Sequence, residues 1–397
     1  MKSTTMNLHG WLCVFGLICS SQAFHTPSVS RHSTTALFQS TSVGADAVKT
    51  DVDQLKRTLE REYASFFSPM EREFYAPEVT FDDPMTALEG VDSYERNVDM
   101  LSGKNIIGKI LFRDAGIVLH NIEGGEVNSD GSINDIITRW TLRLTFQALP
   151  WQPTARFSGI SVYNVQAGGP KGVQVMKQTD YWDSINIAEG GTYQKVPKGA
   201  AISHFLDQMK PSQFAAPSAG KELPYQLLRN GMDYEVRRYP AFTAVQTTYE
   251  RRDEGFSELG SFCSSLDPLS PALFSIVPSE PKAMMWPLGF APPGTSTPPE
   301  IPAALEKLEN PLYRDCEIVT FPERVVAIGS YSDASMEPVV RKADRLLREA
   351  CERDGLTVPA STKDCLTFAQ YDAIYSMGKR RGEVWIELED HPWTNKL

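Results

Sequence analysis

The second half of the chain repeats one order of sequence patterns, and this repeat restricts the fold more than any other feature. The segment YEVRRYPA at residues 234–241 and the segment CEIVTFPE at 316–323 share their glutamate, branched apolar, aromatic and proline positions. A β-rich run follows each segment, then an amphipathic helical pattern, then further strand patterns. Two units of strand–strand–helix–strand–strand predict a duplicated α+β module, in which eight antiparallel strands form one barrel with two helices outside.

The two copies differ most clearly at a pair of arginines. Arg237 and Arg238 in the first copy correspond to Val319 and Thr320 in the second. The residues that the copies share are therefore best interpreted as strand architecture. Neighbouring side chains on a strand point to opposite faces, so at most one of the two arginines can face a given binding site.

The region over residues 223–393 resembles the SOUL, or haem-binding-protein, family. The resemblance is carried by LPYQLLRNGMDYEVRRYPAF, by the helix GFSELGSFCSSL and by the closing AQYDAIYSMGKRRGEVWIEL, while KAMMWPLGF stands where the family has Met-Thr-x-Pro-Val. The sequence departs from the family pattern at Ala373, at Gly382 and at the pair Met285 and Trp286. The resemblance implies a SOUL domain that binds haem or a related tetrapyrrole.

The resemblance also suggests where a tetrapyrrole would bind. Haem needs an apolar slot, cations for its two propionates and usually an axial ligand. Arginines at the start of the first helix would pair with the propionates, an apolar face of that helix would form one wall, and the KAMMWPLGF strand would form the other. Ordinary core packing is the alternative, because an apolar helical face more often belongs to a core. The candidate residues are Arg251, Arg252, Phe256, Leu259, Phe262, Cys263, Met284, Met285 and Trp286.

Axial ligation of haem has little support in the sequence. No histidine occurs between Leu223 and Asp390, and His391 follows on the terminal tail. Cys263 could act as a thiolate ligand, and a buried neutral thiol is the alternative. The sequence therefore assigns no metal ligand and predicts weak, exchangeable binding, as in a carrier or buffer. It also predicts that replacing His391 changes haem affinity little.

Residues 51–184 show helical patterns followed by strands. From Ile136 to Gln147 apolar and polar residues alternate, which predicts an antiparallel sheet with one face in water. The segments FYAPEVTFDDP, GVDSYERNVDML, PWQP, FSGISVY and QTDYWDS resemble the NTF2-like superfamily. They are more similar still to the domain of unknown function that precedes a SOUL domain in plant and algal plastid proteins. The resemblance implies an α+β cone of helices and a curved sheet.

An enzyme built on such a cone would need polar groups inside it. His120 and Asp180 are the candidates, because each alternates with apolar neighbours along a predicted strand and the two could move protons. The alternative is that His120 is a satisfied strand histidine and Asp180 a hydrogen-bonded or exposed carboxylate. Residues 185–222 then form a linker rich in Pro, Lys, Ser and small residues, with one short helix that docks on either domain.

The composition of the N-terminal residues predicts the cellular compartment of the protein. Residues 1–23 have the short apolar core of a signal peptide, and residues 24–50 are rich in Ser and Thr, with no acid before Asp46. A signal peptide followed by Ala-Phe and an acid-poor segment resembles the bipartite presequence of algae with complex plastids. We therefore expect a plastid protein. A secreted protein with a disordered leader is the alternative.

Composition narrows the range of partners. The chain carries 39 Lys and Arg against 50 Asp and Glu, a formal charge of −11, which argues against nucleic-acid binding. After Ala23 no stretch is long and apolar enough for a transmembrane helix. The sequence thus predicts a non-enzymatic, tetrapyrrole-binding plastid protein, with peripheral association with plastid membranes or lipid droplets as a further interaction. The alternatives are an NTF2-like enzyme that uses His120 or Asp180, and a non-catalytic scaffold.

Overall fold

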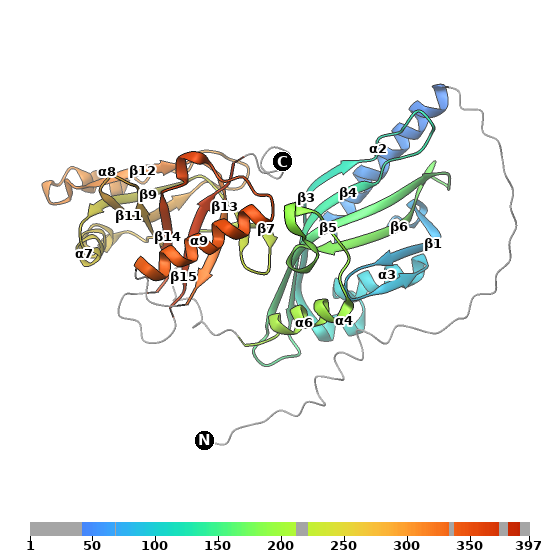
Figure 1. Ribbon diagram of the computed structural model, residues 1–397, viewed down its shortest axis with the longest axis horizontal. Coiled ribbons are helices and arrows are strands. Elements are labelled where there is room, and N and C mark those ends of the chain that lie inside the picture. Colours follow the sequence, from blue (N-terminus) through green and yellow to red (C-terminus); the bar gives the residue numbers. More distant parts are fainter. Residues whose placement is uncertain (1–41, 68, 212–220, 333–336, 373–379, 390–397) are drawn as a thin grey trace, which may run out of the picture.

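The computed structural model describes residues 42–67, 69–211, 221–332, 337–372 and 380–389. The expected signal peptide, most of the expected transit segment and His391 lie outside the described residues. Two α+β domains follow one another along the chain, each built on its own sheet (Figure 1). In the described part of the chain, no helix is both long and apolar enough to cross a bilayer.

The first domain is a curved six-stranded sheet that wraps around helices. Its strand order is β2-β1-β6-β5-β4-β3, and every ladder is antiparallel except the one between β1 and β6. Two long helices lie along the inner face of the sheet and close the cone (Figure 1). The strands are β1 Tyr75–Asp82, β2 Ala87–Glu89, β3 Phe112–Gly124, β4 Ile136–Phe146, β5 Thr154–Ala167 and β6 Val173–Trp182, and the helices are α2 Ser42–Ala64, α3 Val91–Leu101 and α4 Ile106–Leu111.

The alternation of residues along β4 has the expected effect on one face of the sheet. Trp140 and Leu144 point into the core of the cone and are 3% and 4% exposed. The other face was expected to be in water, but Arg139 and Thr141 on that face are 5% and 9% exposed. The reason is tertiary, because the first strand of the second domain packs against β4 and β5.

The segment between the domains folds onto the first domain. α5 Asp183–Asn186 continues from β6, and α6 Lys198–Gln208 packs its Ala201 and Phe205 into the core of the cone. Trp151 donates its indole N–H to the Met209 carbonyl at 2.9 Å and so holds the end of α6. The helix predicted inside the linker is therefore present and belongs to the first domain.

The second domain contains the predicted duplicated unit. Its sheet has the order β12-β9-β11-β10-β14-β15-β13-β8-β7, and each ladder is antiparallel. In the described part of this domain the strands number nine instead of the predicted eight, because β7 precedes the first unit. Among the described residues no ladder joins β12 to β7. The strands are β7 Gln226–Asn230, β8 Glu235–Tyr239, β9 Phe242–Tyr249, β10 Ala272–Ile276, β11 Lys282–Phe290, β12 Cys316–Phe321, β13 Arg324–Tyr331, β14 Leu366–Gln370 and β15 Gly382–Glu387.

Each unit of the second domain places one helix on the outside of the curved sheet. α7 Arg252–Phe262 and α9 Glu337–Arg353 cover one large apolar cluster, while a smaller cluster fills the inside of the sheet. Tyr239 and Trp385 stack inside it with ring centroids 4.4 Å apart. The inside of the barrel-like sheet is therefore a packed core. A third helix, α8 Pro302–Leu308, follows the proline-rich loop.

Buried polar contacts join the two domains. Arg139 of β4 forms a bidentate ion pair with Asp183, with Nη1 to Oδ1 at 3.0 Å, and both side chains are buried. The same guanidinium donates to the Leu228 carbonyl on β7 at 3.3 Å. The backbone N–H of Asn230 donates to Ser158 Oγ at 2.6 Å. These contacts fix β7 of the second domain against β4 and β5 of the first.

Candidate functional site

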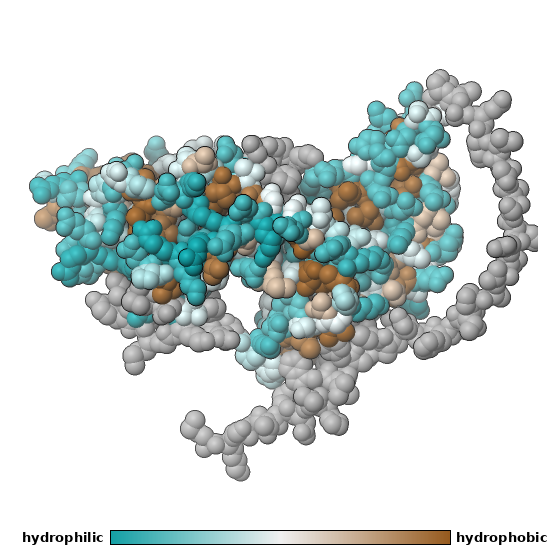
Figure 2. All heavy atoms as spheres, viewed as in Figure 1, coloured by the Kyte–Doolittle hydropathy of each residue, from teal (hydrophilic) through white to brown (hydrophobic). Residues whose placement is uncertain are grey.

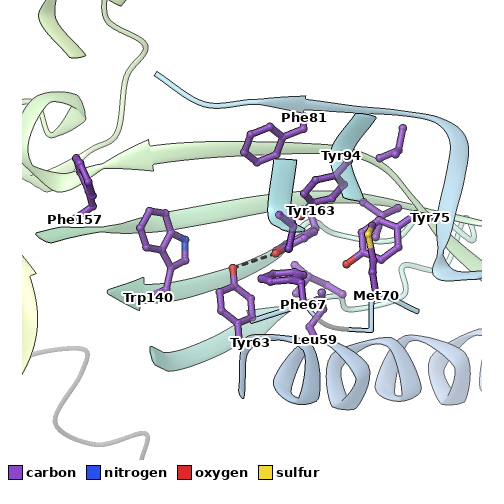
Figure 3. Packing of buried hydrophobic residues seen from close by; sticks show 14 of the residues in the cluster. Leu59, Tyr63, Phe67, Met70, Tyr75, Phe81, Tyr94, Trp140, Phe157 and Tyr163 are labelled. Atoms are coloured by element: carbon purple, nitrogen blue, oxygen red, sulfur yellow. Dashed lines mark hydrogen bonds between the residues drawn. The ribbon is translucent and has the colours of Figure 1, made fainter. Parts of the chain in front are cut away.

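A cavity of about 140 Å³ lies inside the cone of the first domain. Alternate residues of β4, including Trp140 and Leu144, form the wall on the side of the sheet. Tyr63 of α2 and Tyr94 of α3 line the opposite side, and Phe205 of α6 joins the lining. Figure 3 shows the rings of Tyr63, Tyr94 and Trp140 directed into the space between α2 and the sheet. Elements from the whole domain and from the expected linker therefore build this cavity.

Two aspartates line this mainly aromatic cavity. Asp180 near the end of β6 accepts hydrogen bonds from Gln178 Nε2 at 2.8 Å and from the Ser161 hydroxyl. Gln178 in turn accepts a hydrogen bond from Tyr94. Asp83, directly after β1, accepts from two backbone N–H groups of the following turn at 2.7 and 2.5 Å. Burial raises the pKa of Asp180 to about 7 and that of Asp83 to about 6, so both carboxyl groups titrate near neutral pH.

A hydroxyl network holds the side chains beside Asp180 in place. Tyr63 shares hydrogen bonds with Thr138 at 2.8 Å and with Tyr163 at 3.0 Å. Trp140 donates its indole N–H to Ser161 Oγ at 2.8 Å. Each buried hydroxyl in this group has a partner, which satisfies the requirement that burial places on polar atoms. The polar side of the cavity is consequently rigid before any ligand enters.

The backbone is strained where α2 leads into the cavity wall. Phe66 and Phe67 have φ values of 54° and 57°, in the left-handed region that side chains other than glycine rarely adopt. Such residues cost of order 1–3 kcal/mol each and persist where the surrounding packing holds them. Both phenylalanines line the cavity. The strained turn thus brings two rings into the cavity wall directly after the helix ends.

The structure separates His120 from Asp180. His120 shares a hydrogen bond with Thr141 Oγ1 at 3.0 Å, and Thr141 lies on the face of β4 opposite the cavity. Burial lowers the pKa of His120 to about 3, and the nearby Arg139 and Arg238 act in the same direction. His120 therefore stays neutral and does not share a site with Asp180. Of the two predicted candidates for catalysis, only Asp180 faces the cavity.

Most of the predicted tetrapyrrole-binding residues are packed inside the second domain. Leu259 and Phe262 of α7, and Cys263 directly after it, are 0–4% exposed and lie against the sheet. Met284 is fully buried beneath α7, whereas Met285 belongs to the cluster inside the barrel. These two methionines cannot form one wall, because neighbouring strand residues point to opposite faces. The structure gives these five side chains the role of core residues.

The remaining candidates form a partly exposed aromatic edge of α7 and β11, which we name the α7 edge. The rings of Phe256 and Trp286 pack with centroids 6.2 Å apart. The guanidinium of Arg252 lies 5.4 and 5.6 Å from two phenylalanine rings on β10 and β14. Arg251 is exposed and pairs with Asp253 at 2.8 Å. The Trp286 indole N–H is buried and has no hydrogen-bond partner among the described residues. The α7 edge therefore offers aromatic faces and a cation.

A groove of about 700 Å³ lies between the two domains, and we name it the interdomain groove. Arg143 and Arg156 line it from the first domain, and Tyr225, Arg238 and Phe290 line it from the second. Arg156 is paired with Glu235. Arg143 is exposed, and the described residues supply no ion pair for it. The interdomain groove therefore combines a large volume with apolar walls and cations.

The two adjacent arginines of β8 have opposite surroundings, as the sequence predicted. Arg237 is 3% exposed inside the barrel, where it contacts Glu383 at 3.1 Å and Glu235 at 2.6 Å. Arg238 points the other way, toward Gln226 at 3.1 Å, and lines the interdomain groove. Of the two, only Arg238 lines the interdomain groove, so the arginines face opposite sides of the sheet, as the period of a strand predicts.

Two buried cysteines of the second domain are poor metal ligands. Burial raises the pKa of the Cys263 thiol to about 11 and that of Cys351 to about 12, so both are neutral thiols. Within the described ranges no three His, Cys, Asp or Glu side chains come together in a way that would hold a metal ion.

Sequence reasoning missed Asp83 as a cavity residue. The segment FYAPEVTFDDP carries the family resemblance, and nothing in its local pattern singles out Asp83 as a cavity residue. The sequence separates Asp83 from Asp180 by four strands, so only the parallel pairing of β1 with β6 reveals that both line one cavity. Arg143 lies in the alternating strand at 136–147, and that pattern does not distinguish a binding arginine from one on a face in water.

Comparison with protein families separates the chain into two matched regions. Residues 53–170 match a family model described as an uncharacterized conserved protein, DUF2358. Residues 220–387 match the model described as SOUL heme-binding protein. No curated protein is similar enough to count as a match.

Solved structures similar to this chain include NTF2-like proteins. An NTF2-like superfamily protein from Salmonella enterica is 14% identical, with a TM-score of 0.27, over 34% of this chain and 91% of that one. Nuclear transport factor 2 from Cryptosporidium parvum is 12% identical, with a TM-score of 0.23, over 33% and 94%. A hydrolase from Listeria innocua is 10% identical, with a TM-score of 0.28, over 43% and 94%. These three TM-scores are low. The fold of the first domain therefore rests on the strand order and the helices described above, and not on these similarities.

Proposed function

Because this chain joins a DUF2358 domain with an NTF2-like cone to a SOUL domain, we propose that it binds haem or a related tetrapyrrole and carries or buffers it. The observation that carries the proposal is the match of residues 220–387 to the SOUL heme-binding model. That model supports tetrapyrrole binding in general. We infer a binding role, and not a catalytic one, for this second domain.

The α7 edge and the interdomain groove are the two places where the ligand would bind. The α7 edge offers Phe256 and Trp286 as faces for the macrocycle and Arg252 for a propionate. The interdomain groove offers a volume within the usual range of roughly 300–1,000 Å³ for ligand sites, and Arg143 as a cation. Replacement of one arginine in each place distinguishes them.

Binding is expected to be exchangeable. Haem proteins that hold the group firmly use an axial His, Cys, Met or Tyr. Cys263 is a buried neutral thiol, and Met284 and Met285 belong to two different cores. A ligand held by ring contacts and propionate pairing alone dissociates readily, as a carrier or buffer requires.

Hemin titration of the purified full-length chain tests the proposal. We expect a shift of the Soret band and quenching of tryptophan fluorescence as hemin binds. Arg252→Gln weakens binding if the α7 edge is the site, and Arg143→Gln does so if the interdomain groove is. Arg345→Gln, at an exposed arginine of α9, is the matched control and leaves binding unchanged. No Soret shift and no quenching in the wild-type chain would refute tetrapyrrole binding.

We propose a plastid location, supported by the composition of residues 1–50. A fluorescent protein fused behind these residues should enter the plastid in a cell with a complex plastid. Replacement of Phe24 by Ala should retain the fusion outside the plastid, because the resemblance assigns Phe24 to the first transit position. Secretion of the wild-type fusion would contradict the proposal.

Peripheral membrane association has one structural feature in its favour. Ile106 and Ile110 of α4 are 78% and 61% exposed, with Lys104 and Lys109 beside them. Apolar side chains flanked by lysines suit the surface of an anionic bilayer. We expect sedimentation with anionic vesicles, and loss of it in the double variant Ile106→Glu, Ile110→Glu. Equal sedimentation of both proteins would exclude α4 as the contact.

A further inference from the structure

The cavity of the first domain holds carboxyl groups without cations. Asp83 and Asp180 both line it, and none of its described lining residues is Lys, Arg or His. Carboxylates removed from water normally pair with a cation or coordinate a metal. The described part of the chain supplies neither at this place. The cavity therefore has negative charge to offer and no protein group to neutralise it.

The surroundings of the two carboxyl groups confirm this imbalance. Asp180 receives neutral donors, Gln178 and Ser161, and the carboxylates of Asp82 and Asp83 make its ionisation harder. Neither neighbouring lysine lines the cavity: Lys195 forms an ion pair with Asp82, and Lys198, outside the lining, favours the ionised form of Asp83. The phenol groups of Tyr63 and Tyr94, which also approach Asp180, are uncharged at neutral pH.

The rest of the cavity consists largely of aromatic faces. Phe81 and Tyr94 stack with centroids 5.1 Å apart, and both line the cavity together with Trp140 and Tyr63, all four labelled in Figure 3. Aromatic faces carry partial negative charge and attract cations, most strongly when water is excluded. The carboxyl groups and the rings therefore favour the same kind of guest.

We propose that this cavity is a binding site for a small organic cation, an amine attached to an apolar group of about one aromatic ring. A cavity of roughly 150 Å³ with apolar walls holds a guest the size of benzene, and this one measures about 140 Å³. The ring of the guest lies among the aromatic side chains, and its ammonium group lies against Asp180 and Asp83. The site belongs to the first domain and does not depend on tetrapyrrole binding by the second.

Other ligand classes fit the cavity less well. An anion would meet two carboxyl groups, and none of the described lining residues is a Lys, Arg or His that could bind it. A metal ion would lack the three or more protein ligands that it needs, since no such group occurs among the described residues. A neutral molecule of the same size would fill the space and leave the negative charge of the carboxyl groups without a cation among the described lining residues.

Three probes of nearly equal shape separate these possibilities. Benzylamine, benzyl alcohol and benzoate are titrated into the full-length chain at pH 8, where both aspartates are ionised, with isothermal titration calorimetry as the readout. We expect benzylamine to bind at least about tenfold more tightly than benzyl alcohol, and benzoate not to bind. Asp180→Asn removes the preference for the amine. Glu62→Gln is the matched control, because Glu62 is a buried carboxyl of the same domain outside the cavity lining, and it keeps the preference.

The pH dependence gives a second readout. Protonation of Asp180 and Asp83 removes the negative charge, so the affinity for benzylamine should fall as the pH decreases from 8 to 5. Asp83→Asn tests the second carboxyl if Asp180→Asn does not fold, as judged by circular dichroism. Equal binding of benzylamine and benzyl alcohol to the wild-type chain overturns the proposal, and so does a preference for the amine that survives in both folded aspartate variants.

Discussion

Replacement of Glu62 by Gln should stabilise the protein at alkaline pH and leave it unchanged at acid pH. Glu62 lies on α2, is 1% exposed and accepts hydrogen bonds from Tyr75 Oη at 2.6 Å and from the backbone N–H of Glu71 at 2.6 Å. Burial raises its pKa from 4.5 to about 7, and this effect outweighs the two hydrogen bonds. The folded state therefore holds the proton more tightly than the unfolded state does.

The sign and size of the effect follow from this difference. Stability that comes from a raised carboxyl pKa is fully present below pH 4.5 and is lost as the pH rises through about 7. One pKa unit corresponds to about 1.4 kcal/mol, so the wild-type chain loses up to about 3 kcal/mol from this group between pH 4.5 and pH 8. Glutamine resembles the protonated carboxyl in shape and cannot ionise. The variant should therefore exceed the stability of the wild type by less than about 1 kcal/mol at pH 5 and by up to about 3 kcal/mol at pH 8.

Urea denaturation at the two pH values measures this difference, and hydrogen exchange of α2 peptides assigns it to the first domain. Glu60→Gln is the control, because Glu60 is an exposed glutamate on the same helix, and its stability should follow the wild type at both pH values. Asp83 and Asp180 remain in both proteins, so they cancel from the comparison. A difference between Glu62→Gln and wild type that is equal at pH 5 and pH 8 would refute the reasoning.

Three further changes have defined outcomes. Asp183→Asn leaves the buried charge of Arg139 uncompensated at the domain interface and should cost about 3–5 kcal/mol of stability in urea denaturation. Leu259→Ala should cost about 2–5 kcal/mol of stability in the same assay, because the side chain is 0% exposed in the core. The hemin affinity per folded molecule should stay unchanged. A selective loss of hemin affinity would show that Leu259 contacts the ligand. Cys263→Ser should leave the hemin absorbance spectrum unchanged, and a shifted Soret maximum would identify a thiolate ligand.

The candidate sites show which features of a binding site can be predicted from residue spacing and which cannot. The spacing on α7 correctly identified one apolar face, yet the same pattern serves a core and a cofactor slot equally well. Only the packing of α7 on the sheet shows that Leu259 and Phe262 are core residues and that Phe256 stays accessible. Likewise, alternation placed His120 and Asp180 on strands, but bulges in β3 and the curvature of the sheet decide which face each one occupies.

The sequence by itself determined the elements and their local geometry. The repeat predicted two strand–strand–helix–strand–strand units, and the two-residue period of a strand required Arg237 and Arg238 to face opposite ways. These conclusions follow from backbone geometry, which acts between neighbours in the chain.

The tertiary structure decided which groups each face of a strand contacts. Arg237 enters the barrel beside Glu383, whereas Arg238 reaches the interdomain groove. Asp83 and Asp180 come together only because β1 pairs with β6, and Arg139 is buried only because β7 of the second domain covers the sheet. Burial and charge pairing depend on contacts between distant segments, so they appear only once the chain has folded.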